Sequence, residues 1–245
     1  MAERAALITG GSGGIGLAIA RRLGERGYAL TISGRQEEKL LSTAEGLANE
    51  DLKVEAVVAD VTSEEAVVDL VAEHKRQWGR LDCLVNNAGI GIGQAIDGVQ
   101  SKHFDRQVAI NLRALVIATR ESVPMLKEAG AEHGKGLIVN LASIAGIQSP
   151  AWLSVYAATK AAVLSYSRSS QKELAGSGVC CTAIAPGFVA TEMTEFVQGE
   201  VPPEKMIQPE DIAETVSFLL NLTPACAIPE IVVSRSAAGP DSEGL

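Results

Sequence analysis

The chain has 245 residues, of which 47% are hydrophobic and 21% charged, and such a chain is long enough to bury a large core. Its formal net charge of −9 argues against a nucleic-acid partner, since phosphate backbones bind basic surfaces. No apolar run approaches the roughly 20 residues that span a bilayer, and the chain starts without the plan of a signal peptide. We therefore expect one cytoplasmic domain over residues 1–245, with no membrane partner.

The cysteines and histidines give no sign of a metal site or of a disulfide framework. The cysteines form no CxxC pair, and we expect them to be reduced residues of the core. They are Cys83, Cys180, Cys181 and Cys226. The histidines lack metal-ligand spacing and are expected on the surface or on a helix face. They are His74, His103 and His133.

Short β-branched runs alternate with longer helical stretches along the chain. Most of the short runs are apolar throughout, as is typical of strands covered on both faces. This alternation predicts βαβ units, right-handed crossovers and an α/β fold with a parallel sheet, while the polar residues 237–245 predict a frayed tail. The expected strands are Ala5–Thr9, Ala29–Ser33, Val54–Val58, Leu81–Asn86, Gly136–Ser143, Val179–Ala185 and Glu230–Ser234. The expected helices are Ile15–Arg26, Glu37–Asn49, Ser63–Trp78, Ser101–Ala129, Ser154–Ser177 and Pro209–Leu220.

A glycine-rich turn within Thr9–Gly16 follows the first expected strand and opens the first expected helix. Glycines permit a tight turn whose backbone lies close to a pyrophosphate, and the N-terminus of a helix favours that negative charge. The spacing of Gly10, Gly14 and Gly16 differs from the common GxGxxG pattern. A glycine-rich turn without a ligand is the alternative, and the strand–turn–helix context favours a dinucleotide site.

The ends of the second and third strands bear on the choice of cofactor. Gly34 stands where a carboxylate would accept hydrogen bonds from an adenosine ribose 2′-hydroxyl, and Arg35 follows it. A guanidinium can pair with a 2′-phosphate, so we predict NADP(H) rather than NAD(H). A solvated arginine at a helix start is the alternative. Asp60 can accept from an adenine amino group while the Val61 amide donates, although Asp60 could equally begin the next helix.

Two further motifs follow in order. Asn86-Asn87-Ala88-Gly89 ends the fourth expected strand, and Tyr156 and Lys160 lie four residues apart in a helical stretch. Together with Thr9–Gly16, these motifs make the chain resemble the short-chain dehydrogenase/reductase family over about residues 5–220. The resemblance implies a single Rossmann-like, doubly wound domain, with helices on both faces of a seven-stranded parallel sheet of order 3-2-1-4-5-6-7. It also implies a homodimer or homotetramer.

The resemblance further implies which residues hold each part of the cofactor. All lie near the carboxyl ends of strands, where open α/β sheets bind ligands. They are Gly10, Ser12 and Ile15 for the pyrophosphate, Asp60 and Val61 for the adenine, Asn87, Ala88 and Gly89 for the adenosine ribose, and Pro186, Gly187, Val189 and Thr191 for the nicotinamide amide and nearby phosphate.

Tyr156 and Lys160 share one face of the expected helix because they are four residues apart. An unperturbed tyrosine has a pKa near ~10, which is too high for efficient proton exchange at neutral pH. A nearby ammonium favours the phenolate, so we expect Lys160 to lower the pKa of Tyr156. The resemblance implies that Lys160 also bonds the nicotinamide ribose. An amphipathic surface pair is the alternative.

Ser143 ends the fifth expected strand, and its hydroxyl can donate to a substrate oxygen as negative charge develops there. Asn111 matches the family asparagine that orients a water joining Lys160 to solvent. The expected catalytic set is therefore Asn111, Ser143, Tyr156 and Lys160, with no metal. A hydride would pass from the nicotinamide to a carbonyl carbon while Tyr156 gives its proton to the oxygen.

The resemblance places the substrate lid at residues 192–208, a short segment in this chain. Its apolar residues suggest a compact, fairly open, partly apolar pocket, and they are Phe196, Val197, Val201 and Met206. The candidates for the wall of a substrate pocket, each of which could equally be core, are Ile144, Gln148, Leu153, Phe188 and Phe196.

Two segments depart from the family pattern. Glu128–Lys135 is expected to lengthen the link between the fourth helix and the fifth strand, on the surface and away from the chemistry. The chain end lacks the glycine- and aspartate-rich segment of many relatives, which puts the usual tetramer contacts in doubt. A homodimer through the long helices 101–129 and 154–177 is the safer expectation.

The leading hypothesis is an NADP(H)-dependent oxidoreductase acting on a small-molecule ketone or secondary alcohol. A 3-oxoacyl-thioester reductase is one option, and a reductase of small ketones, hydroxy acids or xenobiotic carbonyls is another. The acidic surface argues mildly against an acidic carrier protein as partner. A non-catalytic NADP(H)-binding sensor is the second hypothesis, because fold does not fix function. Isomerase or dehydratase chemistry is the third.

Overall fold

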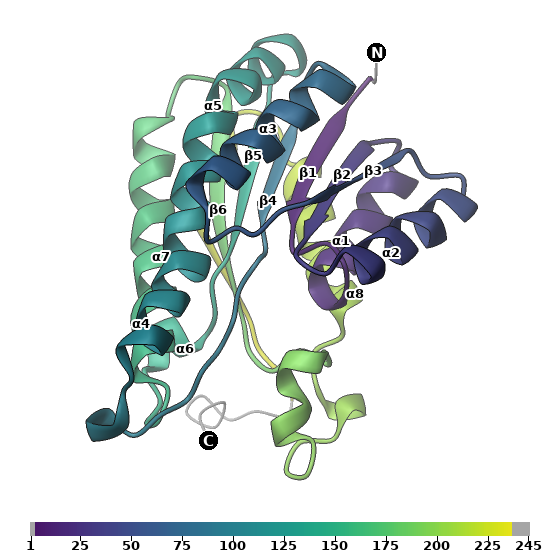
Figure 1. Ribbon diagram of the computed structural model, residues 1–245. Helices are drawn as coiled ribbons and strands as arrows, with labels where there is room; N and C mark the ends of the chain where they lie inside the picture. Colours follow the sequence, from purple (N-terminus) through teal and green to yellow (C-terminus); the bar gives the residue numbers. More distant parts are fainter. Residues whose placement is uncertain (1–2, 237–245) are drawn as a thin grey trace.

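The computed structural model describes residues 3–236, which form a seven-stranded sheet between two layers of helices (Figure 1). The strand order is β3-β2-β1-β4-β5-β6-β7, and every neighbouring pair is parallel. The predicted doubly wound fold and strand order are therefore confirmed. The frayed tail expected at 237–245 lies outside the described residues.

The elements alternate as the sequence predicts. The strands are β1 Ala5–Thr9, β2 Ala29–Gly34, β3 Val54–Val58, β4 Cys83–Asn86, β5 Gly136–Leu141, β6 Val179–Pro186 and β7 Glu230–Val233. The α-helices are α1 Gly14–Glu25, α2 Glu37–Asn49, α3 Glu64–Trp78, α4 Ser101–Val108, α5 Ala114–His133, α6 Ala145–Gln148, α7 Ser154–Glu173 and α8 Pro209–Asn221. Short helical segments, which the sequence analysis did not foresee, are η1 Ile96–Gly98, the π-helical η2 Ala109–Arg113, η3 Glu192–Val197 and η4 Pro203–Lys205.

Alternate residues of the central strands face the two helical layers, because successive side chains of a strand point to opposite faces. Leu7 and Leu84 pack with residues of α3 and α5, whereas Ile8 and Val85 pack with residues of α1, α2 and α8. Both faces of the sheet are thus covered, and the carboxyl edge of the strands is left for a site. Within residues 3–236, no helix is both long and apolar enough to cross a membrane.

The segment Glu128–Lys135 does not form the expected surface link. Helix α5 continues to His133 and ends at Gly134, whose φ of +81° is left-handed. Gly130 is buried, and a Cβ there would lie 2.4 Å from the carbonyl oxygen of Gly178. Helix α5 extends because Gly130, which has no side chain, lets the helix backbone pack against the turn before β6.

A buried polar network joins β4, β5 and α7 beneath the carboxyl edge. Asn86 and Asn140 are partners in the β4–β5 register, and the Asn86 amide donates to Asn140 Oδ1 at 2.9 Å. Asn86 also donates to Thr119 Oγ1 at 3.2 Å, and Asn140 donates to Ser167 Oγ at 2.9 Å. Buried amides are costly unless they are bonded, so these partners fix one another's positions.

Three of the four cysteines are buried, as expected, and they are Cys83, Cys180 and Cys181. Cys226 is only half-buried, so its expected place in the core is wrong. All four are free thiols.

His74 lies on the inner face of α3, which agrees with the expected helix-face position, and it is fully buried. Its Nε2 faces the carbonyl oxygen of Arg80 at 2.9 Å, and a carbonyl can only accept, so Nε2 carries the hydrogen. Its Nδ1 then accepts from Thr31 Oγ1 at 2.8 Å, while Trp78 Nε1 donates to the same hydroxyl at 3.0 Å. Both ring nitrogens are thus satisfied in the neutral form.

Burial lowers the pKa of His74 from 6.5 to about 4. Between these two values the unfolded chain binds one proton more than the folded chain, so the free energy of unfolding falls as the pH falls. Over this window His74 accounts for a loss of about 3 kcal/mol. We expect the free energy of unfolding of His74→Gln to depend less steeply on pH over this window than that of the native chain, whatever the stability of the variant at pH 7. Urea unfolding at pH 7, 5.5 and 4.5 measures it, and an unchanged slope would contradict the assignment.

Candidate active site

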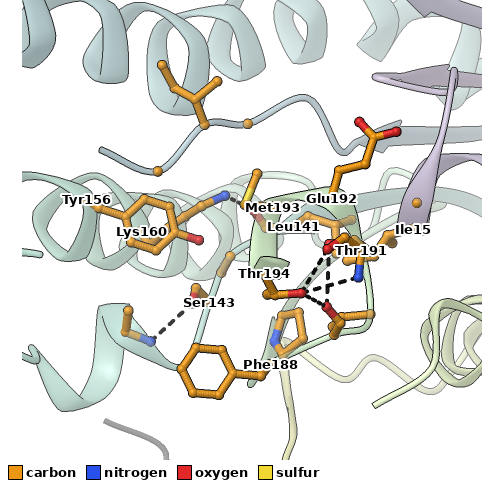
Figure 2. A pocket seen from close by; sticks show the side chains of 18 of the residues that line it. Ile15, Leu141, Ser143, Tyr156, Lys160, Phe188, Thr191, Glu192, Met193 and Thr194 are labelled. Atoms are coloured by element: carbon orange, nitrogen blue, oxygen red, sulfur yellow. Dashed lines mark hydrogen bonds between the residues drawn. The ribbon is translucent and has the colours of Figure 1, made fainter. Parts of the chain in front are cut away.

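The carboxyl ends of β1, β4, β5 and β6 open into one cavity of about 460 Å³ (Figure 2). Its lining comes from the turn after β1, the loop after β4, the segment between β5 and α7, and the segment after β6. The structure thereby brings together most of the residues singled out from the sequence. Those that line the cavity are Gly10, Ser12, Gly14, Ile15, Asn87, Ala88, Gly89, Ser143, Ile144, Gln148, Leu153, Tyr156, Lys160, Pro186, Gly187, Phe188, Val189, Thr191 and Phe196.

The turn after β1 requires glycine at several positions. Gly10 and Gly14 have φ values of +65° and +51°, in the left-handed region that side chains disfavour. Gly16 lies outside the cavity lining, but a Cβ there would lie 2.2 Å from the Gly10 carbonyl oxygen. Helix α1 begins at Gly14, so its unpaired N–H groups and its dipole favour an anionic group at the cavity.

The turn is tied to the end of β4 by four hydrogen bonds. The backbone N–H groups of Asn87 and Ala88 both donate to Thr9 Oγ1 at 3.1 Å. The Asn87 side-chain amide donates to the carbonyl oxygens of Thr9, at 3.0 Å, and Gly10, at 2.9 Å. In this structure, therefore, the Asn87 side chain shapes the turn.

Arg35, Asp60 and Val61 lie beyond the cavity lining, at the ends of β2 and β3. Arg35 is exposed. Hydrogen bonds from Thr62 hold the pKa of Asp60 below its ordinary value, and the charge of Arg35 adds to this effect. A Cβ at Gly34 would lie 3.0 Å from Ser12 Oγ, so the glycine leaves room for the serine of the turn.

Tyr156 and Lys160 lie on the same face of α7, and Ser143 faces them from the end of β5 (Figure 2). The Lys160 ammonium is 5.8 Å from the centre of the Tyr156 ring and donates to the carbonyl oxygen of Leu141 at 2.7 Å. Ser143 Oγ accepts from the Ala145 N–H at 3.2 Å. A hydroxyl, a phenol and an amine thus meet in one cavity.

The electrostatics of this group differ from expectation. Burial raises the pKa of Tyr156, and a hydrogen bond with Ser143 opposes the rise only in part. Burial also lowers the pKa of Lys160 to about 8, because its side chain is only 4% exposed. The expectation that Lys160 lowers the pKa of Tyr156 is therefore wrong for the site as it stands. Desolvation is the largest effect on the pKa of both groups.

Asn111 lies outside the cavity lining, in the π-helical segment η2. Its Oδ1 accepts from the Ile90 N–H at 2.8 Å, and its amide donates to the Ile90 carbonyl oxygen at 2.9 Å and to Thr159 Oγ1 at 3.0 Å. Both amide hydrogens are thus used within the protein. The side chain joins the loop after β4 to α7, which carries Tyr156.

The segment after β6 closes over the glycine-rich turn. Thr191 and Thr194 form a reciprocal cap at the start of η3, with Thr194 Oγ1 bonded to the Thr191 N–H at 3.2 Å. A Cβ on Gly14 would lie 3.0 Å from the methyl group of Thr191. This contact explains why Thr191 lines the same cavity as the turn.

All five wall candidates line the cavity, but three of the four apolar lid residues expected to shape it do not, and they are Val197, Val201 and Met206. Val197 and Met206 are buried, and Val201 is half-buried. Several cavity residues lie outside the motifs and the lid segment singled out from the sequence, and they are Lys39, Ile90, Gly91, Gly93, Pro150 and Trp152. Trp152 could have been predicted from the sequence, because it is an aromatic residue between Ser143 and Tyr156, two residues expected in the site.

Comparisons with known proteins agree with this architecture. A family described as short chain dehydrogenase matches residues 4–201. An uncharacterized oxidoreductase of Staphylococcus aureus is 33% identical over 233 residues, which cover 95% of this chain and 97% of the relative.

Solved structures are similar over nearly the full length. An alcohol dehydrogenase from the archaeon Thermococcus sibiricus, complexed with 5-hydroxy-NADP, has a TM-score of 0.87 at 29% identity and covers 97% of this chain and 98% of its own. A 3-ketoacyl-(acyl-carrier-protein) reductase from Brucella melitensis, complexed with NADH, has a TM-score of 0.86 at 29% identity, with coverages of 98% and 99%. An actinorhodin polyketide ketoreductase variant with NADPH has a TM-score of 0.85 at 31% identity, with coverages of 96% and 97%.

The buried Lys160 predicts a measurable cost in stability. Its folded-state pKa of about 8 lies below the ordinary 10.5, so the unfolded chain binds more protons between these values and stability rises with pH across them. We expect Lys160→Met to be more stable than the native chain at pH 7. At pH 9.5 this advantage should shrink by about 2 kcal/mol. Denaturant unfolding at both pH values tests it, and an advantage independent of pH would contradict it.

Proposed function

Because this chain belongs to the short-chain dehydrogenase/reductase family, we propose that it is an NADP(H)-dependent oxidoreductase that interconverts a ketone and a secondary alcohol. One observation carries the proposal. Ser143, Tyr156 and Lys160 meet in a single cavity that also reaches the glycine-rich turn. Cofactor and substrate can therefore meet beside a proton donor.

The cavity residues fit a dinucleotide. Gly10, Gly14 and Gly16 allow a tight turn in which Cβ atoms would clash with neighbouring protein atoms, and this turn leads into the N-terminus of α1, where a pyrophosphate is favoured. Asn87 to Gly89 and Pro186 to Gly187 line the same cavity and would hold the ribose and the nicotinamide ends. When bound, the nicotinamide supplies or accepts the hydride.

The chain's own residues would manage the proton and the oxygen. Tyr156 donates its proton to the carbonyl oxygen during reduction, and Ser143 donates a hydrogen bond to the same oxygen. Lys160, while charged, stabilises the phenolate that Tyr156 leaves behind. Asn111 keeps Ile90 and Thr159 in place, and we propose that it also helps to hold the water that returns the proton.

The proposed preference for NADP(H) depends on the end of β2. Arg35 is exposed there, and Gly34 offers no carboxylate to a ribose hydroxyl. A guanidinium favours a 2′-phosphate through charge-assisted hydrogen bonds. Similar structures were solved with NADPH and with NADH, so the proposed preference depends on Arg35 and not on similarity to these structures.

We also propose that the chain forms a homodimer through α4, α5 and α7, with a homotetramer as the alternative. Phe104 on α4 supports an interface there, because 47% of its surface is exposed. Sedimentation distinguishes these assemblies from a monomer.

Replacement of Tyr156 by Phe removes the phenolic proton and leaves the ring. We expect Tyr156→Phe to keep its affinity for NADPH and to lose at least about a hundredfold in kcat, which is the usual contribution of a positioned general acid. Loss of NADPH absorbance with a panel of ketones, and NADPH binding by fluorescence, measure the two effects. An unchanged kcat would contradict the assignment. NADPH binding without turnover of any ketone or alcohol would favour a sensor.

Replacement of Arg35 by Ala tests the cofactor preference. We expect the Kd for NADPH to rise about tenfold or more, since hydrogen bonds to charged groups contribute about 1.5–3 kcal/mol. The Kd for NADH should stay the same. Arg21→Ala is the matched control, because Arg21 pairs with Glu50 on the surface and lies outside the cavity lining. A native chain that binds NADH more tightly than NADPH would refute the preference.

A further inference from the structure

The substrate half of the cavity is apolar and aromatic. Aromatic residues make up only 4% of the chain, yet four of them line this cavity, namely Trp152, Tyr156, Phe188 and Phe196. Figure 2 shows Phe188 and Met193 beside the same hollow as Tyr156 and Ser143. The described lining has three charged side chains: Lys160 beneath Tyr156, and Lys39 and Glu192, which pair with one another at 2.5 Å.

Lys39 lies at the glycine-rich turn, since a Cβ on Gly13 would be 3.4 Å from its ammonium. The charged pair is thus at the cofactor end of the cavity. The other side chains that line the cavity are neutral, apart from Lys160. The guanidinium of Arg235, which is not part of this lining, lies 5.9 Å from the centre of the Phe188 ring.

Trp152 has an unusual backbone in this wall. Its φ is +66°, a conformation that is rare for a bulky residue and that persists only where the surroundings impose it. The Trp152 carbonyl oxygen accepts a hydrogen bond from the Gln94 N–H at 2.8 Å, which ties it to the loop after β4. The segment before α7 is therefore held in the shape that places this indole at the cavity.

Gly93 provides the space for the indole. A Cβ at Gly93 would lie 2.3 Å from two atoms of the Trp152 ring, which no real contact allows. The φ of Gly93 is not left-handed, so only the ring, and not the backbone, demands glycine here. The ring packs directly on the backbone of this loop.

The indole also borders a second hollow. A space of about 490 Å³ lies beside the catalytic cavity, and Pro150 and Trp152 are the residues that line both. The other walls of the second hollow include Ile96 and small residues of α7, such as Ala157 and Ala161. Trp152 therefore stands between the two spaces.

We infer that Trp152 is a specificity-determining residue, whose indole limits the length of the substrate and selects uncharged ketones or alcohols with a flat aryl group beside the reacting carbon. The inference rests on the proposed function. A flat ring can stack on the indole and contact Phe188 or Phe196, whereas a carboxylate would lose its hydration among neutral walls. Removal of the indole would join the two hollows and admit longer substrates.

Three variants test this inference in the full chain with NADPH. Trp152→Ala removes the indole. Gly93→Ala leaves Trp152 in the sequence but forces its ring away. Gly98→Ala is the matched control, because it lies in the same loop and a Cβ there meets nothing within 4 Å. The substrates are 2-butanone, acetophenone, 2-acetylnaphthalene and pyruvate.

For the native chain we expect kcat/KM to be highest with acetophenone and lowest with pyruvate. In Trp152→Ala and Gly93→Ala, the ratio of kcat/KM for 2-acetylnaphthalene to that for acetophenone should rise about tenfold, because the larger ring system can enter the space that the indole fills in the native chain. Gly98→Ala should keep the native ratio. A general loss of structure would lower kcat/KM for all substrates together. The ratio of the two kcat/KM values therefore separates an effect on specificity from an effect on stability.

Binding is measured separately, from the quenching of tryptophan fluorescence by 2-acetylnaphthalene, with Trp152→Ala giving the background from Trp78. Quenching that depends on Trp152, without NADPH oxidation by any ketone, would refute the proposed function and support only the part of the inference that the indole binds a flat aryl group. Turnover with an unchanged ratio in both variants, or preference for pyruvate, would overturn the inference. Neither quenching nor turnover would overturn both.

Discussion

Two backbone N–H groups at the end of β4 donate to the hydroxyl of Thr9, and the Asn87 amide returns two hydrogen bonds to the turn after β1. These bonds join the first motif of the chain to the fourth strand at the carboxyl edge of the sheet. The glycine-rich turn has little side-chain packing of its own, so its shape depends on them. The cavity exists because the turn and the loop after β4 are held together, with α7 and the segment after β6 around them.

Some side chains of the candidate site have positions that do not favour the stability of the fold. Lys160 is almost fully buried and meets a carbonyl oxygen rather than a carboxylate. Asn111 uses its amide on Ile90 and Thr159, and η2 adds a π-helical turn that a plain helix would lack. The buried charge of Lys160 lowers stability, and both such a group and a π-helical turn are typical of functional sites. In this chain they converge on Tyr156, which the proposed function uses.

Sequence patterns predicted what depends on local chemistry. The bounds of β1, β3 and α2 match, because apolar runs and turn residues bracket them, and the motif residues meet because parallel strands end at one edge. Features that depend on tertiary packing were missed. The burial of His74 depends on Thr31, the continuation of α5 depends on Gly178, and the place of Trp152 depends on Gly93. The pKa of Tyr156 was misjudged because charge attraction was counted without desolvation.

The pair of Asn86 and Asn140 has a consequence for folding. The two amides are opposite one another in adjacent parallel strands whose other side chains are aliphatic or a thiol. If β5 slipped by one residue against β4, each amide would face hydrocarbon and lose its partners in the middle of the sheet. A shifted register would therefore cost more free energy here than it would between two strands with only aliphatic side chains. This polar pair thus helps to set the register of β4 and β5 as the chain folds.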